Sequence, residues 1–256
     1  MEFVLIALVS IAGLLMGSFF NVCIYRVPRD QSIVKPASRC TSCGTRLAWR
    51  DLMPVISWVS LGGKCRYCKS PISYRYTLVE LLTGLIFVVL YLKFGISGSF
   101  LTYAILCSIL IIATLIDLDF QIIPDGLVLT GAIFALLLIP AGLSVHWKDA
   151  LLGMLAGGGT FLLIALLSSW ILKKEGMGGG DIKLMGMIGL FIGWKLTALS
   201  ILLSIYAGGI IGGLLMLLRK KKRGDAIPYG PFIAAGTVIA ILYGNDLIQW
   251  YILTFL

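Results

Sequence analysis

Long apolar stretches recur along almost the whole chain, and they limit its possible folds more than any other feature. A helix that crosses a bilayer needs about 20 predominantly apolar residues. Eight stretches, of which the sixth is short, approach that pattern: residues 3–22, 78–94, 99–117, 126–143, 150–172, 182–194, 196–218 and 231–250. The mean hydropathy is +1.00 and only 13% of the residues are charged. We therefore expect an all-α polytopic membrane protein with about eight transmembrane helices.

The first apolar stretch is expected to be a membrane anchor and not a cleaved signal peptide. The chain begins Met-Glu-Phe, without a basic segment before the apolar run, and no convincing small-residue cleavage site follows. The expected organisation is a first transmembrane helix at 1–22, a loop at 23–77, and a membrane core at 78–256.

The distribution of Lys and Arg predicts the orientation, because these residues are retained on the cytoplasmic side. With the N-terminus outside, the segments that face the cytoplasm carry 18 of the 21 Lys and Arg. The exceptions are Lys93, Lys148 and Lys195. We therefore expect a multi-pass protein of the bacterial cytoplasmic (inner) membrane, with both termini outside and a basic face inside.

The net charge of +9 describes mainly this cytoplasmic face. A basic membrane face attracts anionic lipid. Nucleic-acid binding is the less favoured interpretation, because no basic stripe interleaved with aromatic residues accompanies the charge. We expect membrane lipid, and no nucleic acid, as a partner.

Four cysteines mark the only large loop, residues 23–77. They form two CxxC pairs, Cys40 with Cys43 and Cys65 with Cys68, which are separated by 21 residues. Two such turns can complete a tetrahedral site with four sulfur ligands, which is a closed structural zinc site. Ten Lys and Arg in the loop would offset the negative charge of zinc bound by four thiolates. So small a loop is expected to need the metal in order to fold.

A pair of redox-active dithiols is the alternative interpretation of these cysteines. It is less favoured because no thioredoxin-like βαβ pattern accompanies them. Disulfides are not expected in the reducing cytoplasm. Cys23 and Cys107 lie in or beside apolar stretches, where cysteine packs as a small hydrophobe.

Four carboxylates gather at the cytoplasmic ends of apolar stretches: Asp117, Asp119, Asp125 and Asp181. Ionisable groups at membrane depth are costly and are therefore candidates for function. Asp119 lies two residues beyond Asp117 and so points about 200° around a helix. Only one of these two can face a given partner.

Asp125 and Asp181 each have a plainer interpretation, as the N-cap of the helix that follows. For Asp181 the preceding glycines favour more than a cap. Gly176 and Gly178, Gly179 and Gly180 permit a close approach of another backbone. We expect such a segment to accept an extended peptide by strand addition, which would place a scissile bond beside the carboxylate.

Two carboxylates in a poorly solvated site cannot both ionise easily, so that one of them retains a proton. Such a pair can activate water and protonate a leaving amine. The chemistry that this arrangement implies is aspartyl proteolysis.

Several motifs together resemble the type IV prepilin peptidase family. They are "GSFFNVCIYRVP" at 17–28, "LIDLDFQIIPD" at 115–125, GxGD at 178–181 and "IPYGPF" at 227–232. The resemblance extends over nearly the whole chain, the cysteine loop included. By matching positions it implies that Asp117 and Asp181 are the catalytic aspartates, with Asp119 and Asp125 as neighbours that tune or cap.

Members of the family cut the basic leader from prepilins and pseudopilins at the cytoplasmic face of the membrane. The cysteine loop resembles the branch that also methylates the new N-terminus with S-adenosylmethionine. No soluble dinucleotide-binding pattern is found in the chain, so the methyltransferase activity rests on the resemblance alone. "AGGGT" at 156–160 lies inside an apolar stretch, where small residues serve close helix packing.

Two rival functions are weighed against proteolysis by aspartates. A serine protease of the rhomboid kind could use Ser97, but it needs a histidine base, and the single histidine, His146, is expected in an outer loop. A single histidine also excludes an HExxH metalloprotease. A proton-coupled transporter could use the buried aspartates, but no inverted repeat is evident and the aspartates gather at one face instead of the midplane.

Overall fold

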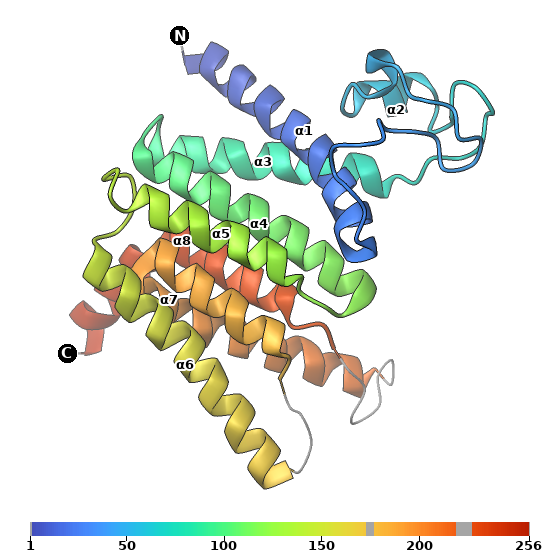
Figure 1. Ribbon diagram of the computed structural model, residues 1–256. Helices are drawn as coiled ribbons and strands as arrows, with labels where there is room; N and C mark the ends of the chain where they lie inside the picture. The colour runs from blue at the N-terminus through green and yellow to red at the C-terminus, as the bar shows by residue number, and fades with distance from the viewer. Residues whose placement is uncertain (1, 173–176, 219–226, 256) are drawn as a thin grey trace. The chain divides into compact units, whose positions relative to one another are not determined.

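Figure 1 shows the computed structural model of the chain, which describes residues 2–172, 177–218 and 227–255. Within these ranges the regular elements are eight α-helices and two short 3-10 helices, with two isolated β-bridges. The all-helical class that the sequence predicts is therefore confirmed. The chain divides into two compact units, Met1–Gly95 and Ile96–Leu256, which are described separately below.

In the first unit, two long helices pack antiparallel. They are α1 (Glu2–Arg26) and α3 (Arg75–Phe94). A Cβ on Gly13 would lie 2.8 Å from Cα of Gly84, and one on Gly17 would lie 2.7 Å from Cα of Glu80. Glycines at these two positions thus let the helix backbones approach closely, as small residues do at membrane helix interfaces.

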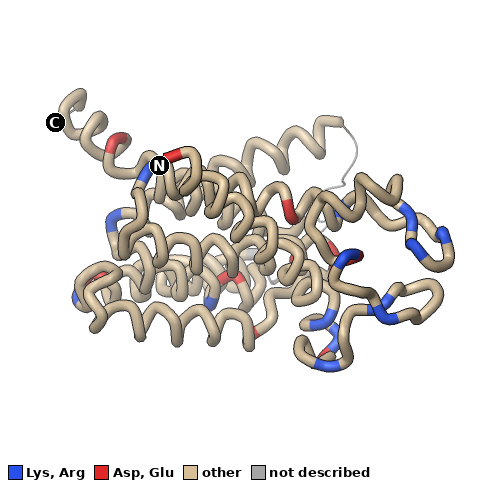
Figure 2. The backbone as a smooth tube through the Cα atoms, turned by 90° about the horizontal axis from the view of Figure 1, so that it is seen from above, with Lys and Arg blue, Asp and Glu red and all other residues tan. Residues whose placement is uncertain are grey.

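Residues between α1 and α3 form a loop with little regular structure. It contains η1 (Val27–Arg29), η2 (Trp49–Asp51) and α2 (Ile56–Ser60). Ten of the 21 Lys and Arg lie in 23–77, and Figure 2 shows basic positions spaced along this loop. Helix α3 packs with α1 and the loop, so it belongs to the first compact unit. The division of the chain by function into 1–22, 23–77 and 78–256 remains a proposal.

The second unit is a helical bundle of five elements. They are α4 (Gly98–Phe120), α5 (Asp125–Leu138), α6 (Trp147–Leu172), α7 (Gly179–Leu217) and α8 (Gly230–Phe255). In the described part of the chain six helices are long and apolar enough to cross a membrane, whereas α5 has only 14 residues. The number is lower than the expected eight because α5 is short and because the stretches 182–194 and 196–218 form one element, α7.

A break at Gly193 divides α7. Its backbone has φ 70° and ψ 173°, outside the helical region and readily adopted only by glycine. Tyr229 lies close enough to Asp181 to interact with it electrostatically, and Asp181 is near the start of α7. Tyr229 also packs against Gly208, which belongs to the second half of α7. Both ends of α7 therefore lie at one end of the bundle, and its two halves run in opposite directions (Figure 1). Each of the two apolar stretches thus corresponds to one half of α7.

Glycines fit α6 closely against the first half of α7. A Cβ on Gly157 would lie 2.5 Å from the carbonyl oxygen of Met185, and Gly153 and Gly189 leave each other no room for a Cβ. By contrast, Gly159 has open space around its Cβ position. The packing role expected for "AGGGT" is confirmed for Gly157.

Gly189→Ala is expected to destabilise this interface, because its methyl group would meet the backbone of Gly153. Overpacking of this kind costs typically about 1–3 kcal/mol. The check is thermal unfolding in detergent, with Gly159→Ala as the control that should leave the midpoint nearly unchanged. Equal midpoints for the two variants would contradict the close approach.

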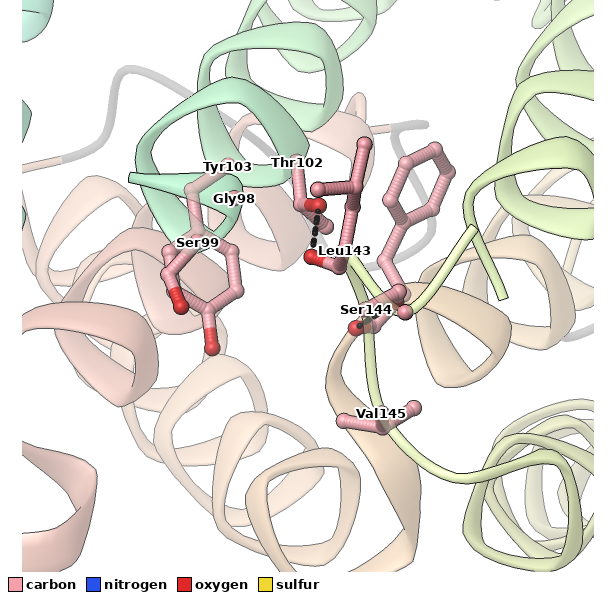
Figure 3. Close-up of a pocket in the computed structure, with 9 residues that line it drawn as sticks. Gly98, Ser99, Thr102, Tyr103, Leu143, Ser144 and Val145 are labelled. Carbon is pink, nitrogen blue, oxygen red and sulfur yellow. Dashed lines mark hydrogen bonds between the residues drawn. The ribbon is translucent and has the colours of Figure 1, made fainter. Parts of the chain in front are cut away.

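A small pocket of about 290 Å³ lies at the end of α4 far from Asp117 (Figure 3). There the hydroxyl of Thr102 donates a hydrogen bond to the carbonyl oxygen of Leu143 at 2.7 Å. Ser144 Oγ donates to the carbonyl oxygen of Phe191 at 3.3 Å. These bonds hold the loop after α5 against α4 and α7.

Candidate active site and metal centre

Asp117 lies in the last turn of α4 and is only 5% exposed. Its Oδ2 accepts a hydrogen bond of 2.8 Å from the backbone amide of Gly230, the first residue of α8. A Cβ on Gly230 would lie 2.8 Å from that same oxygen. Gly230 thus both orients the Asp117 carboxylate and, by having no side chain, leaves room for it.

Asp181 lies in the first turn of α7 and is partly exposed. Its carboxylate is close enough to Asp117 for the two to interact electrostatically. The structure therefore brings together the two carboxylates that the sequence singles out, one from the end of α4 and one from the start of α7.

The segment between α4 and α5 also contacts the start of α7. A Cβ on Gly180 would lie 2.9 Å from Cβ of Ile123, so a glycine is required there by the close approach. Lys183 Nζ lies 2.7 Å and 2.9 Å from the two carboxylate oxygens of Asp125. This ion pair is exposed and adds little stability, but it links α5 to α7 next to Asp181.

Neither aspartate is itself the N-cap residue of its helix. Pro124 is the N-cap residue of α5, and Asp125 is the first residue within that helix. Gly178 is the N-cap of α7, and its cap lacks a side-chain hydrogen bond. Asp181 is the third residue of the helix, and its carboxylate accepts a hydrogen bond from the backbone amide of Gly178, as the third residue of a capping box does.

The described glycines of the GxGD segment have ordinary backbone angles. Gly178 has φ −69°, and neither Gly179 nor Gly180 is among the residues with positive φ. Gly179 has open space around its Cβ position. Gly176, which the sequence groups with them, lies outside the described residues.

Asp119 is exposed on α4, as expected from its rotation away from Asp117. The serine that could serve a rhomboid-like site has a structural role: Ser97 is the N-cap of α4, and its side chain accepts a hydrogen bond from the amide of Phe100 at 3.2 Å. His146 is exposed in the loop before α6. His146 Nδ1 accepts a hydrogen bond from the amide of Lys148 at 3.4 Å, so both side chains bond to nearby backbone amides.

The four loop cysteines converge in the first unit. Their sulfur atoms all lie within 4.8 Å of one another, and the Sγ atoms of Cys40 and Cys68 are 3.8 Å apart. Four sulfur atoms at about 2.3 Å from a tetrahedral zinc ion would be about 3.8 Å apart. The cluster can therefore bind a metal ion.

The two CxxC turns share one backbone design. Cys40 donates its amide to the carbonyl of Thr45 at 3.0 Å, and Cys65 donates to that of Ser70 at 2.8 Å. In each turn the residue after the second cysteine has positive φ, 69° at Gly44 and 60° at Lys69. Two equivalent turns thus bring their four thiols into one cluster.

Hydrogen bonds favour the thiolate form of Cys40 and Cys68, whereas burial and the neighbouring thiols raise the pKa of Cys65. The backbone amides of Cys43 and Ser42 lower the pKa of Cys40 to about 6. The Ser70 hydroxyl, 3.0 Å from Cys68 Sγ, lowers the pKa of Cys68. A metal ion binds thiolates, so both shifts suit a ligand.

Asp51 holds the second CxxC turn in place. It accepts hydrogen bonds from Arg66 Nε at 2.7 Å and from the Tyr67 hydroxyl at 3.0 Å. The bond from Arg66 is the main cause that lowers the pKa of Asp51. Arg66 and Tyr67 are the two residues between Cys65 and Cys68, so this carboxylate fixes the turn through both of them.

Sequence reasoning did not single out the amide of Gly230 or the ring of Tyr229. Tyr229 packs against Phe161 and Phe232 with ring centroids 5.9 Å and 5.8 Å away. Both residues belong to the motif "IPYGPF", but this short sequence by itself predicts only a turn that is followed by a helix. Their proximity to the aspartates depends on how α8 packs against α4.

These observations define a multi-pass membrane protein with two neighbouring carboxylates and a cluster of four cysteines that can bind a metal ion. Residues 11–94 match the bacterial peptidase A24 N-terminal domain, and residues 104–213 match the type IV leader peptidase family. The chain belongs to the type IV leader peptidase family, as the resemblance of its motifs indicates.

Relatives support this membership over nearly the full length. The chain is 36% identical to a prepilin leader peptidase/N-methyltransferase of Pseudomonas putida, over 94% of this chain and 92% of the relative. A protein of the same description from Bacillus subtilis is 33% identical, over 97% of this chain and 98% of the relative. No solved structure matches the chain.

Proposed function

We propose that this protein is a membrane aspartic peptidase that removes the leader from type IV prepilins or pseudopilins, with Asp117 and Asp181 as its catalytic residues. The observation that carries the proposal is that these two carboxylates lie close enough to interact electrostatically, at the end of the bundle where α7 begins. The family membership and the descriptions of the relatives agree with it.

The proposed mechanism needs one ionised and one protonated carboxyl group. The ionised group takes a proton from water, whose oxygen attacks the carbonyl carbon of the scissile peptide bond. The protonated group donates its proton to the carbonyl oxygen, which gives a tetrahedral diol. The group that took the proton from water then gives it to the departing amine nitrogen, and the other carboxylate recovers its proton from the diol as the C–N bond breaks. The amide of Gly230 holds Asp117 in position, and the start of α7 at Gly178, Gly179 and Gly180 leaves space for an extended substrate backbone.

The site is proposed to face the cytoplasm of a bacterial cell, with the N-terminus outside. The aspartates lie at the end of the bundle where α7 begins and ends, and Lys173, Lys174 and the run 219–223 flank that end in sequence. Lys148 and Lys195 lie toward the other end. Lys and Arg are retained in the cytoplasm, so a basic leader would also stay there and would meet the site at the end of the bundle that carries the aspartates.

We also propose that the protein methylates the new N-terminus, as the description of its relatives implies. S-adenosylmethionine, when bound, supplies a methyl group made electrophilic by its sulfonium. Such a donor needs a cavity of small-molecule size, and the first unit contains one of about 880 Å³. The metal at Cys40, Cys43, Cys65 and Cys68 is proposed to be structural zinc.

A test of both activities is incubation of a full-length prepilin with the detergent-purified protein and S-adenosylmethionine, followed by mass measurement of the products. We expect two products from cleavage, and an added methyl mass on the mature chain only. A proton-coupled transporter would leave the substrate intact. Absence of cleavage with several prepilins and pseudopilins would contradict the proposal.

Removal of a metal ligand tests the zinc centre. We expect about one zinc ion per purified chain, as the four-thiolate ligand set implies. Cys65→Ser should lose the metal, because Cys65 is buried in the cluster. Cys23→Ser is the matched control, since Cys23 is also buried in the first unit but lies outside the cluster.

Asp51 supports the second CxxC turn without binding the metal, so we expect its replacement to weaken zinc binding less than the removal of a ligand does. Asp51→Asn should speed the loss of zinc to a chelator by about tenfold, at the low end of what outer-shell changes cause. Metal release at the wild-type rate in this variant would show that the hydrogen bonds to Arg66 and Tyr67 do not stabilise the centre.

A further inference from the structure

The connection between α4 and α5 is short and follows Asp117 closely. Helix α4 ends at Phe120 and α5 begins at Asp125, so only residues 121–124 join them. The amide of Gln121 donates a hydrogen bond of 2.8 Å to the carbonyl oxygen of Asp117. Four residues leave little slack. The start of α5 therefore cannot shift far without moving the last turn of α4, which carries Asp117.

Two contacts fasten this connection to the first turns of α7. A Cβ on Gly180 would lie 2.9 Å from Cβ of Ile123, so Ile123 packs directly against the backbone of α7. One turn later, Lys183 Nζ lies 2.7 Å and 2.9 Å from the two carboxylate oxygens of Asp125. The contacts stand on either side of Asp181 in the sequence. Together they fix the part of α7 that carries this aspartate.

Helix geometry separates the side chain of Lys183 from that of Asp181. Residues three apart share one face of a helix, so Gly180 and Lys183 both face the connection. Asp181 lies two residues before Lys183 and so points about 200° away from it. The ammonium group can therefore act on Asp181 through the placement of α7 and not by direct contact.

The ion pair between Lys183 and Asp125 is too exposed to matter much for the stability of the fold. The two side chains are 56% and 72% exposed, and ion pairs in such surroundings contribute little. Catalysis is more sensitive to position, because a displacement of about 1 Å at a reacting group can cost about 10²-fold in rate. A weak contact at this place can thus change the reaction rate while the fold stays intact.

We infer that Lys183 and Asp125 are positioning residues for peptide cleavage, and that their ion pair holds Asp181 at its working distance from Asp117. The inference deepens the proposed peptidase function and rests on it. The pair joins the segment that follows Asp117 to the helix turn that carries Asp181, which is what a fixed spacing of the two carboxylates requires.

Lys183→Met tests the inference in the cleavage of a full-length prepilin by the detergent-purified protein. Methionine keeps an unbranched side chain and removes the charge, so kcat should fall about tenfold while KM stays within about twofold of the wild-type value. Asp125→Asn should cause a similar loss. The thermal midpoints of both variants should be close to that of the wild-type protein, because the pair is exposed.

Three further variants separate a positioning ion pair from other roles. Lys183→Arg keeps the cation and should retain most of the wild-type rate. Lys183→Met combined with Asp125→Asn should be no slower than the slower single variant, because both changes remove the same contact. Lys195→Met is the matched control, since Lys195 also belongs to α7 but lies beyond the break at Gly193. It should cleave at the wild-type rate.

A wild-type kcat in Lys183→Met or Asp125→Asn, or losses that multiply in the double variant, would overturn the inference and leave the proposed function standing. A raised KM at unchanged kcat would also overturn it, because Lys183 would then bind the substrate. If the wild-type protein cleaves no prepilin or pseudopilin, the proposed function fails and the inference fails with it.

Discussion

Asp117→Asn and Asp181→Asn are each expected to reduce prepilin cleavage by about 10³-fold, within the range of general acid–base contributions. Asparagine keeps the shape of the side chain, and in the first variant it can still accept the hydrogen bond from the amide of Gly230. It can neither take a proton from water nor carry one to the leaving amine. The measurement is the initial rate of leader release, read by mass.

Asp119→Asn is the control for this pair. Asp119 lies two residues beyond Asp117 on α4 but is exposed, and its rotation of about 200° points it away from Asp117. Cleavage should stay within a few-fold of the wild-type rate. A loss in Asp119→Asn as large as that in Asp117→Asn would mean that the wrong carboxylate of the motif has been assigned.

Gly230→Ala is expected to cause the second large loss of cleavage. Its Cβ would lie 2.8 Å from Asp117 Oδ2 and 3.2 Å from Asp117 Cβ, so the carboxylate or the start of α8 must shift. A misplacement of about 1 Å at a catalytic group can cost about 10²-fold in rate. The check is kcat for prepilin cleavage by the folded variant, together with its thermal midpoint.

Gly126→Ala provides the comparison, because nothing lies within 4 Å of a Cβ at that position in the first turn of α5. It should cleave at nearly the wild-type rate. If Gly230→Ala matches it in both rate and stability, the hydrogen bond from Gly230 does not position Asp117.

Features set by composition and short spacing could be predicted from the sequence. Hydropathy alone indicates the apolar stretches, because the bilayer requires long apolar helices whatever packs against them. The two CxxC pairs are equally local, since each turn needs only four residues to present two thiols. Asp117 and Asp181 stood out because carboxylates are rare in membrane segments.

Contacts between distant segments could not be predicted in this way. The pairing of Gly230 with Asp117 joins residues far apart in the chain, and no periodicity encodes it. A reversal between the stretches 182–194 and 196–218 was expected, but the sequence "LFIGWK" did not predict that a single residue, Gly193, makes it within one helical element.

The glycines Gly178, Gly179 and Gly180 have ordinary backbone angles, although glycine permits positive φ. Gly180 is small because Ile123 approaches it closely. Their proposed role toward the substrate therefore depends on the space they leave and not on left-handed geometry.

The central claim is that Asp117 and Asp181 act as one catalytic unit. Single-turnover cleavage by the two Asn variants and by the double variant tests it most directly, because residues that act as a unit have strongly non-additive effects. The double variant should be no slower than the slower single variant. A double-variant loss equal to the product of the two single losses, or a wild-type rate in either single variant, would contradict the account.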